Sequence, residues 1–250
     1  MDIKPSEWMA YRASLELSNE DVVFVGIGLP NLACNLARLT HAPDLFMIYE
    51  SGAVGTIPDR LPISIGDPAL VTDSLAVVPQ ADIFQCFLQR GWISVGFLGG
   101  AQIDPQGNIN TTTIGSDYYN PKVRLPGSGG ACEIATHAQR LLVIMPLSPR
   151  AFVPKVDFVT SPGHRFHNQT RTELGLPGAG PTTLITDHAV FEYHENQFKV
   201  RELYEGRTLD SLKPLMGWEP VAHPKLSIGK PPSAEVIGVL RKLAPSAAHS

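Results

Sequence analysis

The sequence DVVFVGIGLP occupies residues 21–30 and joins a run of apolar residues to a glycine turn and a proline. The apolar run, residues 22–25, is typical of a short strand buried on both faces of a parallel sheet. Gly26 and Gly28 allow a tight turn after the strand, and Pro30 suits the first turn of a helix. The stretch therefore predicts a strand, a turn and a helix, the repeating unit of an α/β fold.

The residues that follow continue this alternation. Leu32, Leu36 and Leu39 lie at helical spacing on one face of the predicted helix, and Pro43 ends it. Further strands are predicted over residues 45–49, 92–98 and 140–145. We therefore predict an α/β fold with an open, mostly parallel sheet and flanking helices, formed by a single domain over residues 1–250.

The remaining elements are predicted from local patterns. They are a loop over 57–68, a helix over 82–89 capped by Asp82, a β-like stretch over 108–113, a helix over 132–138, strands over 156–160 and 182–186, a hairpin pairing 190–193 with 198–200, and a helix from Ser233 whose apolar face carries Val236, Ile237, Leu240 and Leu243. The tail over residues 245–250 is predicted to be disordered.

Charge and apolar content exclude several classes of protein. Lys+Arg 20 against Asp+Glu 24 gives a net charge of -4, with none of the basic clusters that bind nucleic acid or anionic membranes. No apolar run approaches the roughly 18 residues that a membrane span needs. Charged residues make up only 18% of the chain, against about 25% in an average soluble domain. This low charge predicts that part of the surface faces a partner subunit.

The cysteines and the N-terminus favour a cytoplasmic protein. The N-terminal residues lack the apolar stretch and cleavage site of a secretory signal. Cys34, Cys86 and Cys132 are scattered and odd in number, as in a reducing compartment. We expect all three to act as small buried hydrophobic residues.

The sequence disfavours three kinds of site: a dinucleotide site, a serine-hydrolase site and a metal centre. Asn31 stands where the dinucleotide fingerprint requires a third Gly or Ala, although Gly26, Gly28 and Glu50 follow in the right order. Pro126 replaces the leading glycine of a nucleophile elbow. His164 and His167 lie three residues apart but outside any metal motif, so we interpret them as surface histidines and predict no metal.

A carboxylate and two glycine loops remain as candidate chemistry. Glu50 ends a predicted strand, where α/β sheets place their ligand crevices, and Ser51 and Gly52 leave its carboxylate accessible. Spacing alone leaves open whether this carboxylate is catalytic or inert. The glycine pairs at 99–100 and 129–130 either punctuate turns or let a ligand approach backbone N–H groups.

Five short motifs follow one another between residues 26 and 163. The motif YESGAVG (49–55) resembles the Glu-Asn-Gly motif that carries the nucleophilic glutamate in the β subunit of family I CoA-transferases, most of all its glutaconate-type members, with Ser51 in the Asn place. The others are GIGLP (26–30), GGAQID (99–104) with GNIN (107–110), PKVR (121–124) with GSGGA (127–131), and DFVTSPG (157–163). Together they cover roughly residues 22–180.

The resemblance implies that CoA moves from an acyl-CoA to a carboxylic acid through a thioester on Glu50, without metal or resident cofactor. It implies a homologous α (A) subunit in an α2β2 or larger assembly, with the active site at their interface. The acceptor is expected to be a dicarboxylate of about glutaconate size. Residues implied to contact the substrate or CoA are Ser51, Gly52, Gly99, Gly100, Gln102, Gly129 and Gly130.

Other functions stay open at this stage. Relatives of this fold decarboxylate a glutaconyl-CoA-like ester or open a ring on a CoA ester by hydrolysis, and they tend to replace the glutamate that this chain keeps as Glu50. A further alternative is a catalytically silent subunit that supports its partner.

Overall fold

The computed structural model describes residues 3–58 and 60–244, so the predicted disorder of residues 245–250 lies outside the described residues. The chain forms two compact units, one of residues 1–97 with 231–250 and the other of residues 98–230. We call them unit 1 and unit 2. The organisation as a single domain stays a prediction, because two compact units can still fold cooperatively as one domain.

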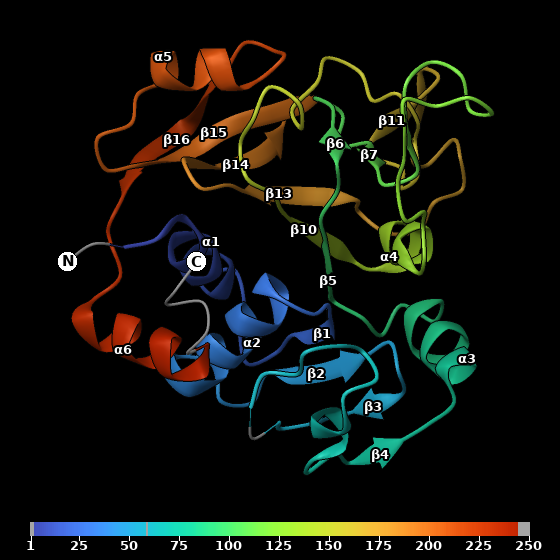
Figure 1. Cartoon of the computed structure of the whole chain (residues 1–250), viewed down its shortest axis with the longest axis vertical. Coiled ribbons are helices and arrows are strands. Elements are labelled where there is room, and N and C mark those ends of the chain that lie inside the picture. Colours follow the sequence, from blue (N-terminus) through green and yellow to red (C-terminus); the bar gives the residue numbers. More distant parts are fainter. Residues whose placement is uncertain (1–2, 59, 245–250) are drawn as a thin grey trace. The chain divides into compact units, whose positions relative to one another are not determined.

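The sheet strands of unit 1 follow the predicted α/β pattern. β1 lies between β5 and β2 and is parallel to both, whereas β3 and β4 add antiparallel strands beyond β2. Val23, Phe24 and Val25 are buried, as expected for a central strand. The strands of this unit are β1 (Val22–Val25), β2 (Phe46–Tyr49), β3 (Ala53–Val54), β4 (Ala76–Val77) and β5 (Val95–Leu98), whose last residue falls in unit 2 (Figure 1).

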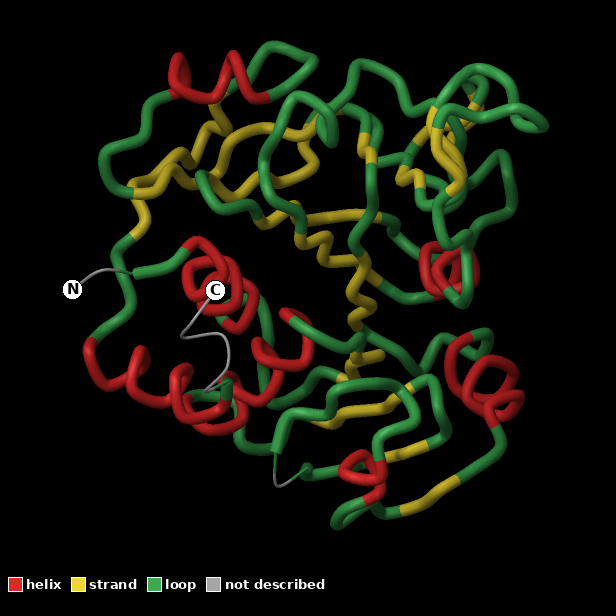
Figure 2. Tube along the Cα trace, in the orientation of Figure 1, coloured by secondary structure: helices red, strands yellow, loops and turns green. Residues whose placement is uncertain are grey.

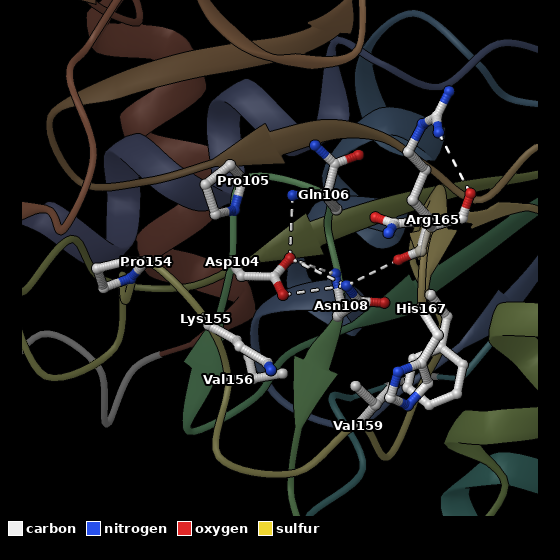
Figure 3. Close-up of a pocket in the computed structure, with 12 residues that line it drawn as sticks. Asp104, Pro105, Gln106, Asn108, Pro154, Lys155, Val156, Val159, Arg165 and His167 are labelled. Atoms are coloured by element: carbon white, nitrogen blue, oxygen red, sulfur yellow. Dashed lines mark hydrogen bonds between the residues drawn. The ribbon is translucent and has the colours of Figure 1, made fainter.

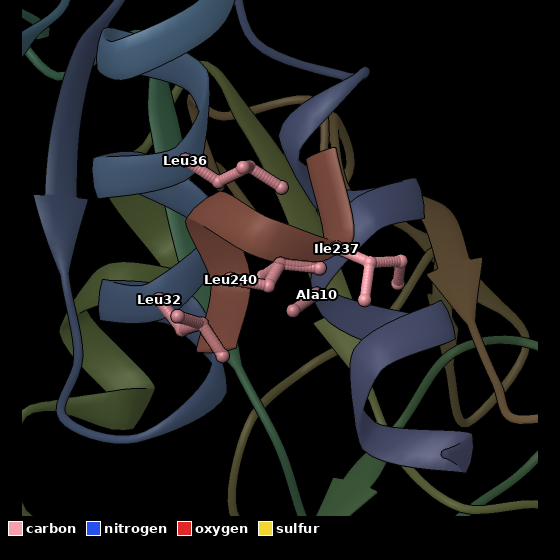
Figure 4. Close-up of a cluster of buried hydrophobic side chains, with 5 residues drawn as sticks. All are labelled: Ala10, Leu32, Leu36, Ile237 and Leu240. Carbon is pink, nitrogen blue, oxygen red and sulfur yellow. The ribbon is translucent and has the colours of Figure 1, made fainter. Parts of the chain in front are cut away.

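Three helices of unit 1 share one apolar core. They are α1 (Pro5–Ser14), α2 (Leu29–Thr40) and α6 (Ala234–Leu243). Figure 4 shows the side chains of Ala10, Leu32, Leu36, Ile237 and Leu240 gathered between them, all at most 6% exposed. The helix predicted from Ser233 is α6, and the Ser233 side chain caps it by accepting from the Val236 N–H.

Two predictions for the helices of unit 1 are wrong. Leu39 is 63% exposed although it lies at helical spacing from Leu32 and Leu36, because the buried face of α2 ends before its last turn. The helix after β4 begins earlier than predicted, as α3 (Gln80–Asp82) continued by a π-helix η2 (Ile83–Leu88). Its N-cap position is Pro79, and the Asp82 side chain makes no cap hydrogen bond.

The sheet strands of unit 2 follow the order β16-β15-β14-β13-β10 and mix parallel with antiparallel pairs. β10 and β13 are parallel, and β14 and β15 form the predicted hairpin, with Glu195 and Asn196 at positive φ in its turn. β16 was not predicted from the sequence, because it is largely exposed and lacks an apolar alternation. These strands are β10 (Arg140–Ile144), β13 (Pro181–Ile185), β14 (Ala189–His194), β15 (Gln197–Tyr204) and β16 (Ala222–Gly229).

Short elements make up the rest of the chain, and loops predominate in Figure 2. The predicted helix over 132–138 is α4 (Ala131–His137). The two-residue ladders are β6 (Gln102–Ile103) with β7 (Ile109–Asn110), β8 (Thr113–Ile114) with β9 (Val123–Arg124), and β11 (Arg165–Phe166) with β12 (Gln169–Thr170). The remaining helices are η1 (Pro68–Val71), α5 (Leu209–Leu212) and η3 (Lys213–Leu215).

The strand predicted over residues 156–160 is wrong. This segment is a loop held by separate anchors: the Asp157 N–H donates to Gln102 Oε1 at 3.0 Å, and the Thr160 N–H donates to the Ile109 carbonyl at 2.9 Å. These separate bonds take the place of the regular ladder of a strand.

Cysteine burial departs from the sequence prediction at two positions. Cys34 is buried, whereas Cys132 is half-buried and Cys86 is exposed on η2. No helix within residues 3–58 and 60–244 is long and apolar enough to cross a membrane.

His164 is not the surface histidine that the sequence predicted. Its ring stacks on Tyr193 with centroids 3.4 Å apart, and its Nε2 lies 2.7 Å from the Pro181 carbonyl oxygen. Burial lowers the pKa of His164 to about 4 from its ordinary 6.5, so the ring is neutral in the folded chain.

The free energy of unfolding is expected to fall by on the order of 2 kcal/mol between pH 6.5 and pH 4.5 through His164. The unfolded chain takes up this proton at a higher pH than the folded chain does. The neutral His164 ring therefore makes its full contribution to the free energy of unfolding above pH 6.5, and this contribution is lost as the pH falls toward 4. Urea unfolding at a series of pH values, compared with His164→Gln, measures it; the same pH slope in both proteins would contradict the prediction.

Candidate active site

Glu50 lies on a tight turn at the carboxyl end of β2. The Gly52 N–H donates to the Tyr49 carbonyl at 3.0 Å, which places Glu50 and Ser51 at the two corners of the turn. Ser51 is exposed and Glu50 is half-buried. The loop over 26–28 lies at the same edge of the sheet, because Val25 of β1 pairs with Tyr49 of the parallel β2. This is the edge at which α/β sheets bind ligands.

Gly52 is the residue that permits this turn. Its φ is 111°, and a Cβ added there would lie 2.0 Å from the Val78 carbonyl oxygen. The Val78 N–H in turn donates to the Gly52 carbonyl at 3.0 Å. Any side chain at position 52 would therefore push the segment after β4 away from the turn that carries Glu50.

This close approach brings Gln80 to Glu50. The Gln80 side-chain Nε2 donates to Glu50 Oε1 at 3.3 Å. The sequence analysis did not identify Gln80, since no motif marks it and 30 residues separate the pair.

A network of buried hydrogen bonds begins at Tyr49, the residue before Glu50. The Tyr49 hydroxyl donates to Asn31 Oδ1 at 2.7 Å, and Asn35 Nδ2 donates to the same oxygen at 2.7 Å. Burial raises the pKa of Tyr49, so its hydroxyl stays a neutral donor. Asn31 occupies the place of the third glycine in a dinucleotide fingerprint, and here its side chain joins α2 to β2.

The first glycine loop belongs to unit 2 and has packing reasons for its composition. A Cβ on Gly100 would lie 2.4 Å from Ile109 Cγ2, and one on Gly99 would lie 3.2 Å from the Ile144 carbonyl oxygen. Gln102 is buried, and its Oε1 accepts from Asn110 Nδ2 at 2.8 Å while its Nε2 donates to Asp157 at 3.2 Å. The contact of these residues with CoA stays a prediction.

The second glycine loop, residues 127–130, is anchored at one end and open at the other. The Gly127 N–H donates to the Thr111 carbonyl at 2.8 Å, and Thr111 Oγ1 donates back to the Gly127 carbonyl at 2.8 Å. Gly129 is exposed at a φ of 50°, with no atom within 4 Å of a Cβ added there, whereas Gly130 has a φ of -78°. Among the described residues, no acceptor receives the backbone N–H of Gly129 or Gly130.

The predicted site residues thus fall into two sets. Glu50, Ser51 and Gly52 form one turn in unit 1, and the glycine loops with Gln102 belong to unit 2. The part of the chain that the structure describes holds no group of three or more His, Cys, Asp or Glu side chains arranged for a metal ion.

A cavity of unit 2, lined by both polar and apolar side chains, was not predicted from the sequence. It encloses about 520 Å³ and contains none of the predicted site residues. Figure 3 shows Asp104 on its wall, where the carboxylate accepts from the backbone N–H groups of Gln106 and Asn108. Burial raises the pKa of Asp104. The cavity also carries the cationic side chains of Lys155 and Arg165.

Comparison of the chain with known proteins points to one family. Residues 6–213 match the coenzyme A transferase family. The chain is 51% identical over 215 residues to the B subunit of 3-oxoadipate CoA-transferase from Pseudomonas knackmussii, covering 85% of this chain and 82% of that protein. It is 37% identical over 203 residues to the B subunit of glutaconate CoA-transferase from Acidaminococcus fermentans, covering 79% and 74%.

A solved structure agrees with these relatives. The glutaconate coenzyme A-transferase of Acidaminococcus fermentans superposes with a TM-score of 0.88 and 32% identity, covering 96% of this chain and 94% of that chain. The α/β fold class and the family resemblance inferred from the sequence motifs are thereby confirmed. The chain belongs to the coenzyme A transferase family, in which it is similar to B subunits.

Proposed function

We propose that this chain is the B subunit of a CoA-transferase in which Glu50 is the covalent nucleophile. The observation that carries the proposal is the turn at the carboxyl end of β2, where Gly52 holds the carboxylate of Glu50 at the accessible edge of the parallel strands. The Glu-Ser-Gly motif lies within the part of the chain that matches the family.

The exchange uses a carboxylate as a temporary acyl acceptor. One oxygen of Glu50 attacks the thioester carbonyl of the acyl-CoA, the C–S bond breaks, and CoA leaves as a thiolate. The thiolate then attacks the glutamyl carbon of the resulting anhydride and expels the donor acid as its carboxylate. The acceptor acid attacks the glutamyl-CoA thioester, and the same two steps run in reverse to yield the new acyl-CoA.

Each attack places negative charge on a carbonyl oxygen, which needs hydrogen-bond donors. The backbone N–H groups of Gly129 and Gly130 suit this role, because both lack a protein acceptor among the described residues. The absence of a Cβ at both positions lets an acyl group approach the backbone.

We infer that the acceptor is a dicarboxylic acid of five or six carbons. Two relatives are named for 3-oxoadipate and for glutaconate, and both acids carry a carboxylate at each end. The higher identity to the 3-oxoadipate enzyme extends the expected size range beyond glutaconate itself.

We propose that the active enzyme contains a homologous A subunit in an α2β2 or larger assembly and works in the cytoplasm. The low charge content supports a covered surface, and unit 1 exposes large apolar side chains close in sequence to β3 and β4. They include Ile57, Ile63, Ile65, Leu75 and Val77. The free cysteines support a reducing compartment.

Mass spectrometry of the chain, co-expressed with its A subunit and incubated with a panel of acyl-CoAs, tests the proposal. The expected result is a glutamyl-CoA adduct on the peptide that contains Glu50, discharged by a dicarboxylic acid. Release of CO₂, or of free CoA without an acceptor, in the absence of the adduct would instead assign a decarboxylase or a hydrolase. A complex with neither adduct nor turnover would favour a structural role for this chain.

Gly130→Ala is expected to lower kcat by about tenfold or more, since a methyl group would crowd an oxyanion bound at the loop. The φ of -78° is compatible with alanine, so the melting temperature should stay level or rise slightly. Gly238→Ala is the matched control, because a Cβ added to this α6 glycine has no atom within 4 Å. A loss of stability without a change in kcat would assign Gly130 a purely structural role.

A further inference from the structure

We propose that Gln80 is a catalytic residue whose side-chain N–H group stabilises the oxyanion formed on Glu50 Oε1 when the glutamyl carbon is attacked. This inference rests on the proposed role of Glu50 as the nucleophile. It assigns separate functions to the two carboxylate oxygens, one that attacks and one that carries charge.

The geometry singles out this side chain. Gln80 Nε2 lies 3.3 Å from Glu50 Oε1, and no other side chain of the described residues hydrogen-bonds to the Glu50 carboxylate. Gln80 is exposed and makes no second side-chain hydrogen bond within that part of the chain. Its carboxamide is therefore free to follow the carboxylate as the latter becomes an anhydride and then a thioester.

The backbone delivers Gln80 to this place. The Val78 N–H donates to the Gly52 carbonyl at 3.0 Å, which ties the segment entering α3 to the turn that carries Glu50. Pro79 then occupies the N-cap position, and Gln80 is the first residue of the helix. The hydrogen bond between Val78 and Gly52 thus brings Gln80 close to Glu50, although 30 residues separate the two in the sequence.

The chemistry gives the contact its function. With Oε1 held by Gln80, the other oxygen, Oε2, is the one free to attack the acyl thioester and form the anhydride. The CoA thiolate then adds to the glutamyl carbon, and the electron pair of its carbonyl bond moves onto Oε1. Collapse of this intermediate restores the Oε1 carbonyl and breaks the bond to Oε2, which leaves with the donor acid. In the anhydride and in the thioester Oε1 is a neutral carbonyl oxygen, and it gains negative charge when the glutamyl carbon is attacked. A donor there therefore stabilises this transition state more than the acylated intermediate that precedes it.

The test measures the glutamyl-CoA thioester itself. Wild type, Gln80→Ala and Gln80→Met, each assembled with the A subunit, are mixed with acyl-CoA, quenched at successive times and analysed by mass spectrometry. Methionine keeps the length of the side chain but has no N–H group. Gln85→Ala is the matched control, because Gln85 is also an exposed glutamine of the same helical segment.

Both Gln80 variants are expected to form and discharge the thioester about 10²-fold more slowly than wild type, with Gln85→Ala unchanged. A second readout is the infrared carbonyl band of the thioester in chain labelled with ¹³C-glutamate. Loss of a hydrogen bond to Oε1 should move this band to higher frequency in the Gln80 variants.

The two proposals fail in different ways. A wild-type enzyme that turns over without any adduct on Glu50 overturns the nucleophile assignment. A wild-type adduct together with rates and a carbonyl band in both Gln80 variants that match those of Gln85→Ala overturns the role of Gln80 alone.

Discussion

Glu50→Ala is expected to reduce CoA exchange by at least about a thousandfold, because the covalent route through the glutamyl thioester disappears with the carboxylate. Folding should be unaffected. Glu50 is half-buried on a turn, and its side chain contacts the described residues through one hydrogen bond of 3.3 Å. The measurement is label exchange between an isotopically labelled acyl-CoA and free dicarboxylate, followed in the assembled enzyme.

Glu20→Ala provides the matched control, since Glu20 is an exposed carboxylate of the same unit but lies before β1, at the opposite end of the strands from Glu50. It should exchange label at the wild-type rate. If Glu50→Ala keeps more than about a tenth of the wild-type rate, the nucleophile lies elsewhere.

Arg171→Ala is expected to lower the free energy of unfolding by roughly 3 kcal/mol or more. The buried guanidinium donates from Nε to the Gly178 carbonyl at 2.6 Å, from Nη1 to Gly163 at 3.0 Å and from Nη2 to Ala135 at 2.8 Å. It also reaches the carbonyls of Pro162 and Thr136. Alanine would leave these carbonyl groups without their donor, and buried acceptors are costly to leave unpaired.

Chemical denaturation of the two variants Arg171→Ala and Arg165→Ala measures this difference. Arg165 belongs to the same segment but is exposed, so its loss should change stability by less than about 0.5 kcal/mol. A cost below about 1 kcal/mol for Arg171→Ala would mean that water or a local shift replaces the guanidinium. Because Ala135 and Thr136 belong to α4, which follows the 127–130 loop, the same variant should also raise local hydrogen exchange in that helix.

Local patterns in the sequence were sufficient for part of this protein. The apolar run 22–25, the positive φ of Gly28 and the proline at the start of α2 lie within ten residues and each favours one conformation. The hairpin turn at Glu195 and Asn196 and the cap at Ser233 are equally local. The position of Glu50 at the end of β2 follows from the same kind of signal, because the apolar run that predicts this strand stops directly before Glu50.

Contacts between residues far apart in the sequence determined the remaining structure, and no periodic pattern of residue types predicts them. β3 and β4 have two residues each, and they form only because β3 pairs with both β2 and β4. Arg171 and His164 look like surface residues by type. In the fold Arg171 is buried and His164 is half-buried, and their hydrogen-bond partners are as distant in sequence as Ala135 and Pro181.

The candidate site divides in the same way. The sequence by itself determined the family, the strand–turn–helix start of the fold and the identity of Glu50 as the candidate nucleophile, since each rests on short motifs whose own residues are neighbours in the chain. The tertiary structure alone placed Gln80 on Glu50 and Asn31 on Tyr49. Those pairs depend on where the backbone of one element meets another. At position 52, for example, a Cβ would lie 2.0 Å from the Val78 carbonyl oxygen, so only glycine fits, and such distances are properties of the folded chain.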